Sequence, residues 1–361
     1  MKTKYSVLMF DAAYPPPVFG GKEKQAHILS RELLNNNIRV NVLTYMNSIT
    51  SNREYESVPV DRVKKNTFSL PVLLFKLIYY RFICNVLHVH TPSTIGKIIS
   101  LAGAFLRFKV VFKFPNENLL DSKNWFQKYV WSLMMRYVDL FVVLESDTKN
   151  KLLSSNVKNE KIFHVANGVR VPEVNVNSDN KTVNIIFVGR LVSQKRCSDL
   201  INSCASLRSR CPDWHLTIVG DGPLRVELES LAITSGIGDK VTFTGYQDDT
   251  LDYMSAADVL VLPSSKEGMS NVLLEAMSLG LPIITTCVGS SSHQLGNCGL
   301  PYLFEVGDVQ ALCEKLEELI QDKDSRKNYG HCLRMRCIKY FSIHNIAKQY
   351  IDQYGRITMK K

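Results

Sequence analysis

The sequence predicts an α/β protein made of two doubly wound domains, each with a parallel sheet between layers of helices. Three observations support this fold class. At 361 residues, the chain is longer than a single core usually requires. Short apolar runs of strand length alternate with segments of helix length. The alternation pauses once, near the middle of the chain, and then begins again.

The first half of the chain contains six short apolar runs, separated by helix-length segments such as 21–37. This alternation is typical of parallel sheets, because each crossover between parallel strands needs a long connection that is usually a helix. The predicted strands are residues 5–10, 39–44, 86–90, 109–114, 139–144 and 161–165. We therefore assign residues 1–165 to a first domain.

Residues 166–182 are polar, contain Gly, Pro and Asn, and show no helical period, so we predict a linker there. A second domain is predicted over residues 183–342. Its expected strands are residues 183–190, 214–220, 240–245, 258–264 and 282–288. Doubly wound domains bind ligands at the carboxyl ends of their strands, and we expect these ends of the two domains to face each other across a cleft.

The net charge of +10 lies entirely in the first half of the chain. Residues 1–180 hold 24 Lys and Arg against 14 Asp and Glu, a surplus of 10, whereas residues 181–361 hold 20 of each. Such a surplus favours an anionic partner, and nucleic acid, membrane lipid and a phosphorylated substrate are the alternatives. A role in solubility alone is a further explanation.

The cysteines and the apolar runs predict where the protein works. Nine cysteines with no export signal predict free thiols in a reducing, cytoplasmic compartment, since the first apolar run stops at Asp11 as a strand would. No C-x2-C pair is present, so we predict no metal site. Lys or Arg interrupts each later apolar stretch before the roughly 18 residues that a spanning helix needs, so we predict no transmembrane helix.

Two motifs follow the first two strands of the second domain. Arg190 and Lys195 lie in a strand-to-helix loop, where two cations suit a diphosphate, although surface solvation explains them equally. Gly220 and Gly222 flank Asp221 after the next strand. Glycines there let the backbone approach a ligand, or they simply form a turn.

The segment 262–284 gives the strongest signal for a site. Gly268 permits a sharp turn, Ser270 is placed to N-cap a helix, and Gly280 is placed to end it. The free N–H groups at the start of this helix would bind phosphate. Glu267 precedes the helix and Glu275 lies about one turn inside it. Carboxylates so close to an anion site would repel phosphate, so we expect them to bind hydroxyl groups, one on a sugar and one on a ribose. The alternative is that both carboxylates only complement the helix dipole.

In the first domain, Gly20 and Gly21 precede a helix, and this pair leaves space for a phosphate or sugar to approach the backbone. The dinucleotide fingerprint G-x-G-x-x-G is absent, which argues against a nicotinamide enzyme. His88 and His90 end a strand and point in the same direction, either as packing residues or as a ligand contact.

Taken together, "FGGKEKQAHILSREL", "NGV", "VGRLVSQK", "VGDGP", "PSSKEGMSNVLLEAMSLGLPII" and "FSIHNIAKQYIDQY" resemble glycosyltransferase family 4 over essentially the whole chain. Members of this family are retaining, nucleotide-sugar-dependent enzymes of the GT-B fold. The two glutamates separated by seven residues are the specific part of the resemblance. It implies that the final helix, residues 343–361, packs back onto the first domain.

The resemblance also implies roles for individual residues. Arg190 and Lys195 would neutralise the donor diphosphate, Glu267 would hold the sugar and Glu275 the ribose. Tyr246 would lie near the base. The candidate catalytic residues are Arg190, Lys195 and Glu267, and the candidate substrate-binding residues are Gly20, Gly21, His90, Asn116, Asp221, Tyr246, Gly268, Met269, Ser270, Asn271, Val272 and Glu275.

Two segments depart from the family pattern. Many members have a His after the strand that corresponds to 109–114, whereas this chain continues with Pro115 and Asn116, so Asn116 or Glu117 would have to replace that contact. The familiar G-G-x-x-E segment appears as "VGSSSHQL", which places His293 at the usual carboxylate position. The first departure concerns the acceptor side of the mechanism.

The resemblance implies transfer of a hexosyl unit from a nucleotide diphosphate sugar to an acceptor hydroxyl, with retention and without a metal or other cofactor. Stabilisation of the leaving diphosphate would be the main catalytic task. Basic aromatic segments at 73–82 and 124–140 suggest an anionic membrane surface, with core packing as the alternative. With a membrane surface, the acceptor would be a lipid-linked sugar or another sugar in bacterial polysaccharide or lipopolysaccharide assembly. The alternatives are an epimerase-like enzyme of the same fold and a basic nucleic-acid-binding protein, although no nucleic-acid motif is present.

Overall fold

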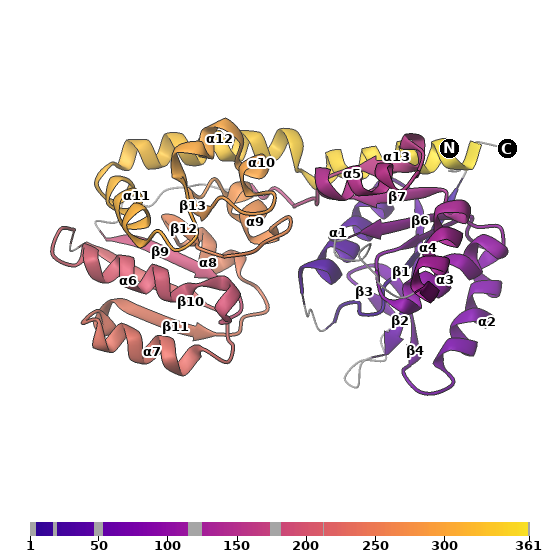
Figure 1. The fold of residues 1–361 in the computed structure, drawn as a ribbon, viewed down its shortest axis with the longest axis horizontal. Helices are drawn as coiled ribbons and strands as arrows, with labels where there is room; N and C mark the ends of the chain where they lie inside the picture. The colour runs from indigo at the N-terminus through magenta and orange to yellow at the C-terminus, as the bar shows by residue number, and fades with distance from the viewer. Residues whose placement is uncertain are drawn as a thin grey trace. The chain divides into compact units, whose positions relative to one another are not determined.

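The computed structural model describes residues 5–16, 20–46, 53–114, 125–173, 182–211 and 213–359. The chain forms two compact units (Figure 1). Unit 1 contains Met1–Gly168 and Ile343–Lys361, and unit 2 contains Val169–Ser342. The division falls between Gly168 and Val169, inside the polar segment 166–182.

The sheet of unit 1 has the order β3-β4-β2-β1-β5-β6-β7-β8, in which only β3 is antiparallel to its neighbour. The six strands predicted for this half are confirmed with small shifts at their ends. The short β3 and the strand β4 were missed, because Pro59 and Asp61 interrupt the apolar pattern there. The bounds are β1 Ser6–Phe10, β2 Arg39–Met46, β3 Glu54–Tyr55, β4 Val58–Lys64, β5 Val86–Val89, β6 Lys109–Phe114, β7 Leu140–Val143 and β8 Ile162–His164.

Helices cover both faces of this sheet, because its strands are apolar on both sides. In β1, Val7 and Met9 belong to one core, whereas Leu8 and Phe10 belong to the other. The first core packs under α1 (Gly21–Asn35) and the C-terminal helix α13 (Ile343–Met359). The second packs under α2 (Ser69–Arg81), α3 (Thr94–Phe105), α4 (Trp125–Tyr137) and α5 (Ser146–Ser154). The return of the final helix to the first unit is confirmed.

Side-chain contacts join α13 to the rest of unit 1. Tyr5 donates its hydroxyl hydrogen bond to the carbonyl of Ile351 at 2.8 Å, and His344 Nδ1 lies 3.1 Å from Glu32 Oε1 on α1. The hydroxyl of the buried Tyr354 lies 2.6 Å from His88 Nδ1 on β5. The C-terminal helix is therefore an integral part of the first core.

The sheet of unit 2 is parallel and has the order β11-β10-β9-β12-β13-β14. The five strands predicted for this half are confirmed, and only the two-residue β14 was missed. The strands are β9 Val183–Val188, β10 Trp214–Val219, β11 Val241–Gly245, β12 Val259–Leu262, β13 Ile283–Thr286 and β14 Leu303–Phe304. The helices are α6 Cys197–Leu207, α7 Arg225–Thr234, α8 Leu251–Ser255, α9 Asn271–Leu279, α10 Ser291–Leu295, α11 Val309–Gln321 and α12 Lys323–Tyr340. Short 3-10 turns are η2 Asn159–Lys161 in unit 1, and η3 Ser193–Lys195, η4 Gly238–Lys240 and η5 Gly296–Tyr302 in unit 2.

In both sheets the order of the strands reverses at a central strand. In unit 1 this strand is β1, which lies between β2 and β5, and in unit 2 it is β9, between β10 and β12. Connections on the two sides of this strand lead in opposite directions, which makes it the topological switch point of the sheet. Ligands of doubly wound proteins bind at this point.

The cysteines correct one prediction. Cys298 and Cys332 form a disulfide across 34 residues of sequence, so the expectation that all nine cysteines are free thiols is wrong for this pair. The other seven are free, and six of them are buried. Across the part of the chain that the structure describes, no helix has the length and apolarity to span a membrane. Within the same ranges, no three His, Cys, Asp or Glu residues gather as metal ligands would.

Candidate active site

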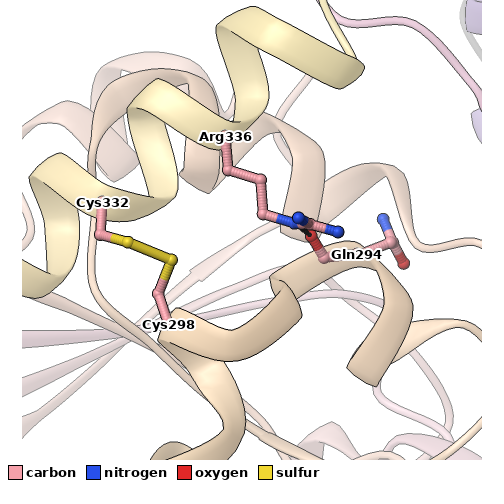
Figure 2. The surroundings of a disulfide bond; sticks show 4 residues. All are labelled: Gln294, Cys298, Cys332 and Arg336. Atoms are coloured by element: carbon pink, nitrogen blue, oxygen red, sulfur yellow. Dashed lines mark hydrogen bonds between the residues drawn. A yellow bond between two sulfur atoms is a disulfide. The ribbon is translucent and has the colours of Figure 1, made fainter.

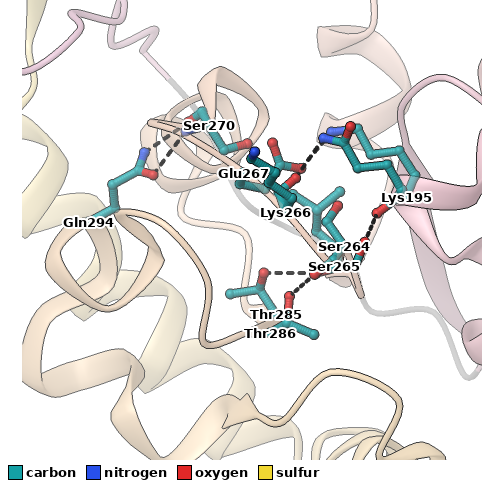
Figure 3. A network of polar contacts seen from close by, with 11 residues as sticks. Lys195, Ser264, Ser265, Lys266, Glu267, Ser270, Thr285, Thr286 and Gln294 are labelled. Atoms are coloured by element: carbon teal, nitrogen blue, oxygen red, sulfur yellow. Dashed lines mark hydrogen bonds and ion pairs between the residues drawn. The ribbon is translucent and has the colours of Figure 1, made fainter. Parts of the chain in front are cut away.

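Two loops meet at the carboxyl end of the unit 2 sheet, one after β9 and one after β12. Ser265 donates two hydrogen bonds to the carbonyl of Gln194, from its backbone N–H at 2.8 Å and its hydroxyl at 3.1 Å. Gln194 in turn donates its side-chain amide to the carbonyl of Lys266 at 2.7 Å. These bonds fix the two loops of the switch point against each other (Figure 3).

An ion pair lies between the same two loops. Lys195 Nζ is 2.5 Å from Glu267 Oε1, and the side chains are 18% and 13% exposed (Figure 3). Sequence reasoning assigned these residues to different parts of a ligand and did not predict their contact. An ammonium group has three N–H donors, so Lys195 keeps donors for an anion while Glu267 holds it.

A second cation accompanies the pair. Arg190 follows β9 by two residues and is exposed. Its side chain forms no hydrogen bond or ion pair with any residue that the structure describes. A guanidinium without a partner is ready to bind a planar or tetrahedral anion in two-point fashion. Of the two predicted cations in this loop, Lys195 is therefore paired with Glu267, and Arg190 is exposed.

The glycines after β10 are explained by backbone contact. A Cβ on Gly220 would lie 2.0 Å from the carbonyl oxygen of Gly189, and one on Gly222 would lie 2.4 Å from that of Leu191. The N–H of Leu191 donates to the carbonyl of Asp221 at 2.9 Å, and this bond holds the loop after β9 against the loop after β10. The turn explanation of these glycines thus has a direct cause in the fold.

Asp221 and Tyr246 form local contacts at the other end of the site. Asp221 accepts from the Gly222 N–H at 2.7 Å and from Arg225 at 3.2 Å. Tyr246 follows β11, is 60% exposed, and donates its hydroxyl to Asp248 at 3.0 Å. Its ring remains accessible for stacking.

The start of α9 differs from the prediction in its cap. Ser270 is the N-cap residue, but its side chain makes no capping hydrogen bond, so that part of the prediction is wrong. Gln294 of α10 serves the buried backbone of Ser270 instead. It accepts from the Ser270 N–H at 3.0 Å and donates to the Ser270 carbonyl at 2.8 Å (Figure 3). Gly280 ends the helix with φ of 73°, as predicted.

Gln294 is held in turn by the long helix α12. Arg336 donates to the carbonyl of Gln294 at 2.8 Å and to that of His293 at 2.6 Å. One turn earlier on α12, Cys332 is bonded to Cys298 of η5 (Figure 2). The start of α9 is therefore supported by α10, which α12 anchors. No sequence motif indicates this chain of contacts.

The loop after β13 closes around Glu267. Gly289 has φ of 55°, and a Cβ there would lie 2.2 Å from the carbonyl oxygen of Glu267. The N–H of Ser290 donates to the carbonyl of Gly268 at 3.3 Å. Glu275 is buried in α9, 7% exposed. The remaining predicted residues of this segment, Met269, Asn271 and Val272, surround the start of α9 and are partly exposed.

In unit 1, Gly20 and Gly21 mark the start of α1 and are exposed. His90 follows β5 and is buried, with its ring centroid 4.2 Å from that of His88. Burial, followed by the charge of Lys113, holds the pKa of His88 well below its ordinary value, so His88 is neutral. Packing explains His88, which contacts α13.

Lys113 lies on β6, just before the segment in which the family pattern is broken. It is buried and donates to Asn167 Oδ1 at 3.0 Å. Burial lowers the pKa of Lys113 to about 8, and the charge of Asp11 opposes this shift. Asn116 and Glu117, the predicted substitutes for the family His, lie outside the described residues.

Comparisons with known proteins agree with this architecture. Residues 19–171 match the family described as Glycosyltransferase Family 4, and residues 182–322 match Glycosyl transferases group 1. The chain is 28% identical to the capsular polysaccharide biosynthesis glycosyltransferase CapM of Staphylococcus aureus, over 74% of this chain and 76% of that protein. It is 31% identical to the N-acetyl-alpha-D-glucosaminyl L-malate synthase of Bacillus anthracis, over 47% of this chain and 44% of the relative.

Several other curated relatives are matched over about half of their length, as with the lipopolysaccharide core biosynthesis glycosyltransferase LpsE of Rhizobium meliloti, at 29% identity over 46% of this chain and 48% of that protein. Among solved structures, Anabaena Alr3699/HepE in complex with UDP superimposes with a TM-score of 0.80 at 18% identity, over 97% of this chain and 100% of that one. A glycosyltransferase from Rickettsia africae reaches 0.82 at 16% identity, over 99% and 100%. Both are similar in fold.

Proposed function

Since the chain belongs to the family 4 glycosyltransferases of the GT-B fold, we propose that it transfers a hexosyl unit from a nucleotide diphosphate sugar to an acceptor hydroxyl. The transfer retains the configuration of the anomeric carbon and needs neither a metal nor another cofactor. The observation that carries the proposal is the Lys195–Glu267 pair beside the exposed Arg190, at the switch point of the second sheet.

The two cations would bind the donor diphosphate. As the bond to the sugar breaks, negative charge grows on the departing phosphate oxygens. Arg190 and Lys195 would therefore bind the transition state more strongly than the ground state, which is the condition for catalysis. The N–H groups of Asn271 and Val272 at the start of α9 add a positive helix end. The Ser270 N–H, also predicted for this role, donates to Gln294 instead. A phosphate oxygen of the leaving group would take the proton of the acceptor hydroxyl.

Glu267 would have two partners in the loaded enzyme. One carboxylate oxygen keeps Lys195 in place, as the structure has it, and the other accepts from a hydroxyl of the donor sugar. Glu275 would accept from the ribose, and the exposed ring of Tyr246 would stack on the base. Anabaena Alr3699/HepE has been solved with UDP-glucose, which supports a nucleotide sugar as donor.

The acceptor would be a sugar or a lipid-linked sugar in the assembly of a bacterial surface polysaccharide or lipopolysaccharide. The names of the relatives CapM and LpsE support this setting. We place the enzyme in the cytoplasm, at the inner face of the membrane. An epimerase of the same fold is the second candidate, and it would convert the donor without any acceptor.

A panel of nucleotide sugars and free nucleoside diphosphates, scored by thermal stabilisation, tests the proposal. One donor and its nucleoside diphosphate should raise the melting temperature, because each binds only the native state. Arg190→Ala should remove most of this shift. Arg210→Ala is the matched control, since Arg210 is an exposed cation of the same unit that pairs with Glu317 at the surface.

Three outcomes would count against the proposal. Absence of a shift with any donor, from a folded protein, removes the support for a nucleotide sugar. If the rise in melting temperature persists in Arg190→Ala, the diphosphate binds outside the predicted loop. Conversion of the donor into an isomer without acceptor would establish the epimerase instead.

A further inference from the structure

The helix α2 is apolar on two faces, and only one of them is in the core. Ser69, Leu73, Leu77 and Tyr80 are buried against the sheet. A second stripe, at the helical spacing of three or four residues, points to solvent. It consists of Phe68, Val72, Phe75, Tyr79 and Phe82, which are 72%, 41%, 72%, 57% and 87% exposed. An amphipathic helix of a protein with no partner would carry polar residues on that face.

The neighbouring helices continue this apolar surface. α3 lies beside both α2 and α4, and all three pack by their inner faces on the same core. Figure 1 shows the three helices together along one side of unit 1. We call their outer face the α2–α4 surface. Besides the stripe of α2, it contains Ile98 and Phe105 of α3 and Trp125, Phe126, Tyr129 and Tyr137 of α4, all exposed.

The charge on these helices has one sign. α2, α3 and α4 contain no Asp or Glu. Their partly or fully exposed cations are Lys76, Arg81, Lys128 and Arg136, whereas Lys97 is buried against Trp131. Further cations adjoin them, since the exposed Lys64 and Lys65 precede α2 and the exposed Arg107 follows α3. Asp61 on β4 is a neighbouring carboxylate, and it pairs with Lys76 at 2.7 Å.

We propose that the α2–α4 surface docks unit 1 onto an anionic lipid bilayer. Exposed Phe and Trp insert at the boundary of headgroups and acyl chains, Tyr places its hydroxyl in the headgroup layer, and Lys and Arg bind anionic headgroups. A second copy of this chain is a poorer occupant of the same face, because a symmetric contact would oppose two sets of cations.

This docking extends the proposed function by giving it a place to meet a lipid-linked acceptor, and it rests on the proposed function only in that respect. It also assigns to the basic first half of the chain a partner that the diphosphate site does not need. That site lies in unit 2, where 21 Asp and Glu outnumber 17 Lys and Arg.

The test is co-sedimentation of the full chain with vesicles of phosphatidylcholine, with or without phosphatidylglycerol. The protein should bind vesicles that contain phosphatidylglycerol, and binding should weaken as salt is added. Phe75→Ser with Phe82→Ser should weaken it by about tenfold or more. Val226→Ser with Ile233→Ser is the matched control. These residues of α7 are 74% and 70% exposed, but their helix also contains Glu227 and Glu229.

The inference is overturned if anionic vesicles bind no protein at low salt, or if both double variants bind equally. It is equally overturned if Phe75→Ser with Phe82→Ser abolishes self-association measured by sedimentation and leaves vesicle binding unchanged. Thermal stabilisation by the donor is measured without lipid. A failure of docking would therefore leave the transfer reaction standing, and the reverse holds as well.

Discussion

In both sheets a hydroxyl side chain joins the loops at the switch point, but the polar groups around it are partly or fully exposed in one unit and buried in the other. In unit 2, Ser265 joins the loops after β9 and β12 through the carbonyl of Gln194. In unit 1, Thr91 joins the loops after β1 and β5, since its hydroxyl donates to Asp11 Oδ1 at 2.6 Å and accepts from the Ala12 N–H at 2.6 Å. Each sheet thus fixes its central loops with one hydroxyl residue.

What surrounds that hydroxyl differs between the units. Around Ser265 are the partly exposed Lys195 and Glu267 and the open Arg190, all of which a ligand can reach. Around Thr91 the polar groups are buried, and Lys113 has lost part of its basicity to desolvation. The difference teaches that a switch point supplies the location of a site, whereas the exposure of its charges decides whether it can bind an anion.

The largest expected effect tests the open site. Lys195→Met should lower transferase turnover by about 100- to 1,000-fold, because a fixed positive charge at the leaving diphosphate is removed. Steady-state kinetics with the donor found by thermal stabilisation would measure it. Lys195→Arg, which keeps the charge, should retain more activity than Lys195→Met. Full turnover of Lys195→Met would show that this pair lies away from the reacting atoms.

The closed site is tested by pH. The pKa of Lys113 falls from 10.5 in the unfolded chain to about 8 in the native state, so between these values only the unfolded chain binds the proton. The free energy of unfolding should therefore rise as pH rises through this window, by about 3 kcal/mol for this group. Urea unfolding of wild type and Lys113→Met across the window should show the rise only in wild type. Parallel curves would contradict the desolvation of Lys113.

The contact between the loops after β9 and β10 is tested by glycine substitution. Gly222→Ala places a Cβ against the backbone of Leu191 and should lower the free energy of unfolding by about 2 to 3 kcal/mol. Gly236→Ala is the control, with φ of 74° and no heavy atom within 4 Å of the added Cβ. It should cost about 1 kcal/mol from backbone strain alone. Equal costs in urea unfolding would argue against a close approach of these loops.

A smaller effect is expected from the support of α9. Gln294→Ala should lower the free energy of unfolding by about 1 to 2 kcal/mol, because the buried N–H of Ser270 loses its acceptor. It should also weaken the thermal stabilisation by the donor. Gln310→Ala removes an exposed amide that donates to Glu314 on the same helix at 2.8 Å, and it should change neither measurement. An unchanged donor shift in Gln294→Ala would separate α10 from the site.

Sequence periodicity was sufficient for much of the fold. Strands that are buried on both faces read as continuous apolar runs, so β1, β9 and their parallel neighbours were found from the sequence. Strand β4 escaped because it lies near the edge of its sheet and contains Pro59, Asp61 and Arg62. The loop positions of Arg190, Lys195 and Glu267 could be predicted because they follow from the strands that precede them, whereas the roles of these residues stay predictions.

Contacts between distant segments were decided only by the tertiary structure. The sequence gives no signal that Gln294 serves the backbone of Ser270, that Lys195 meets Glu267, or that Cys298 bonds to Cys332. Local patterns report which residues are buried and where elements end, since both follow from short-range periodicity. Pairing across 24, 72 or 34 residues depends on how the elements pack, and only the folded chain brings these atoms together.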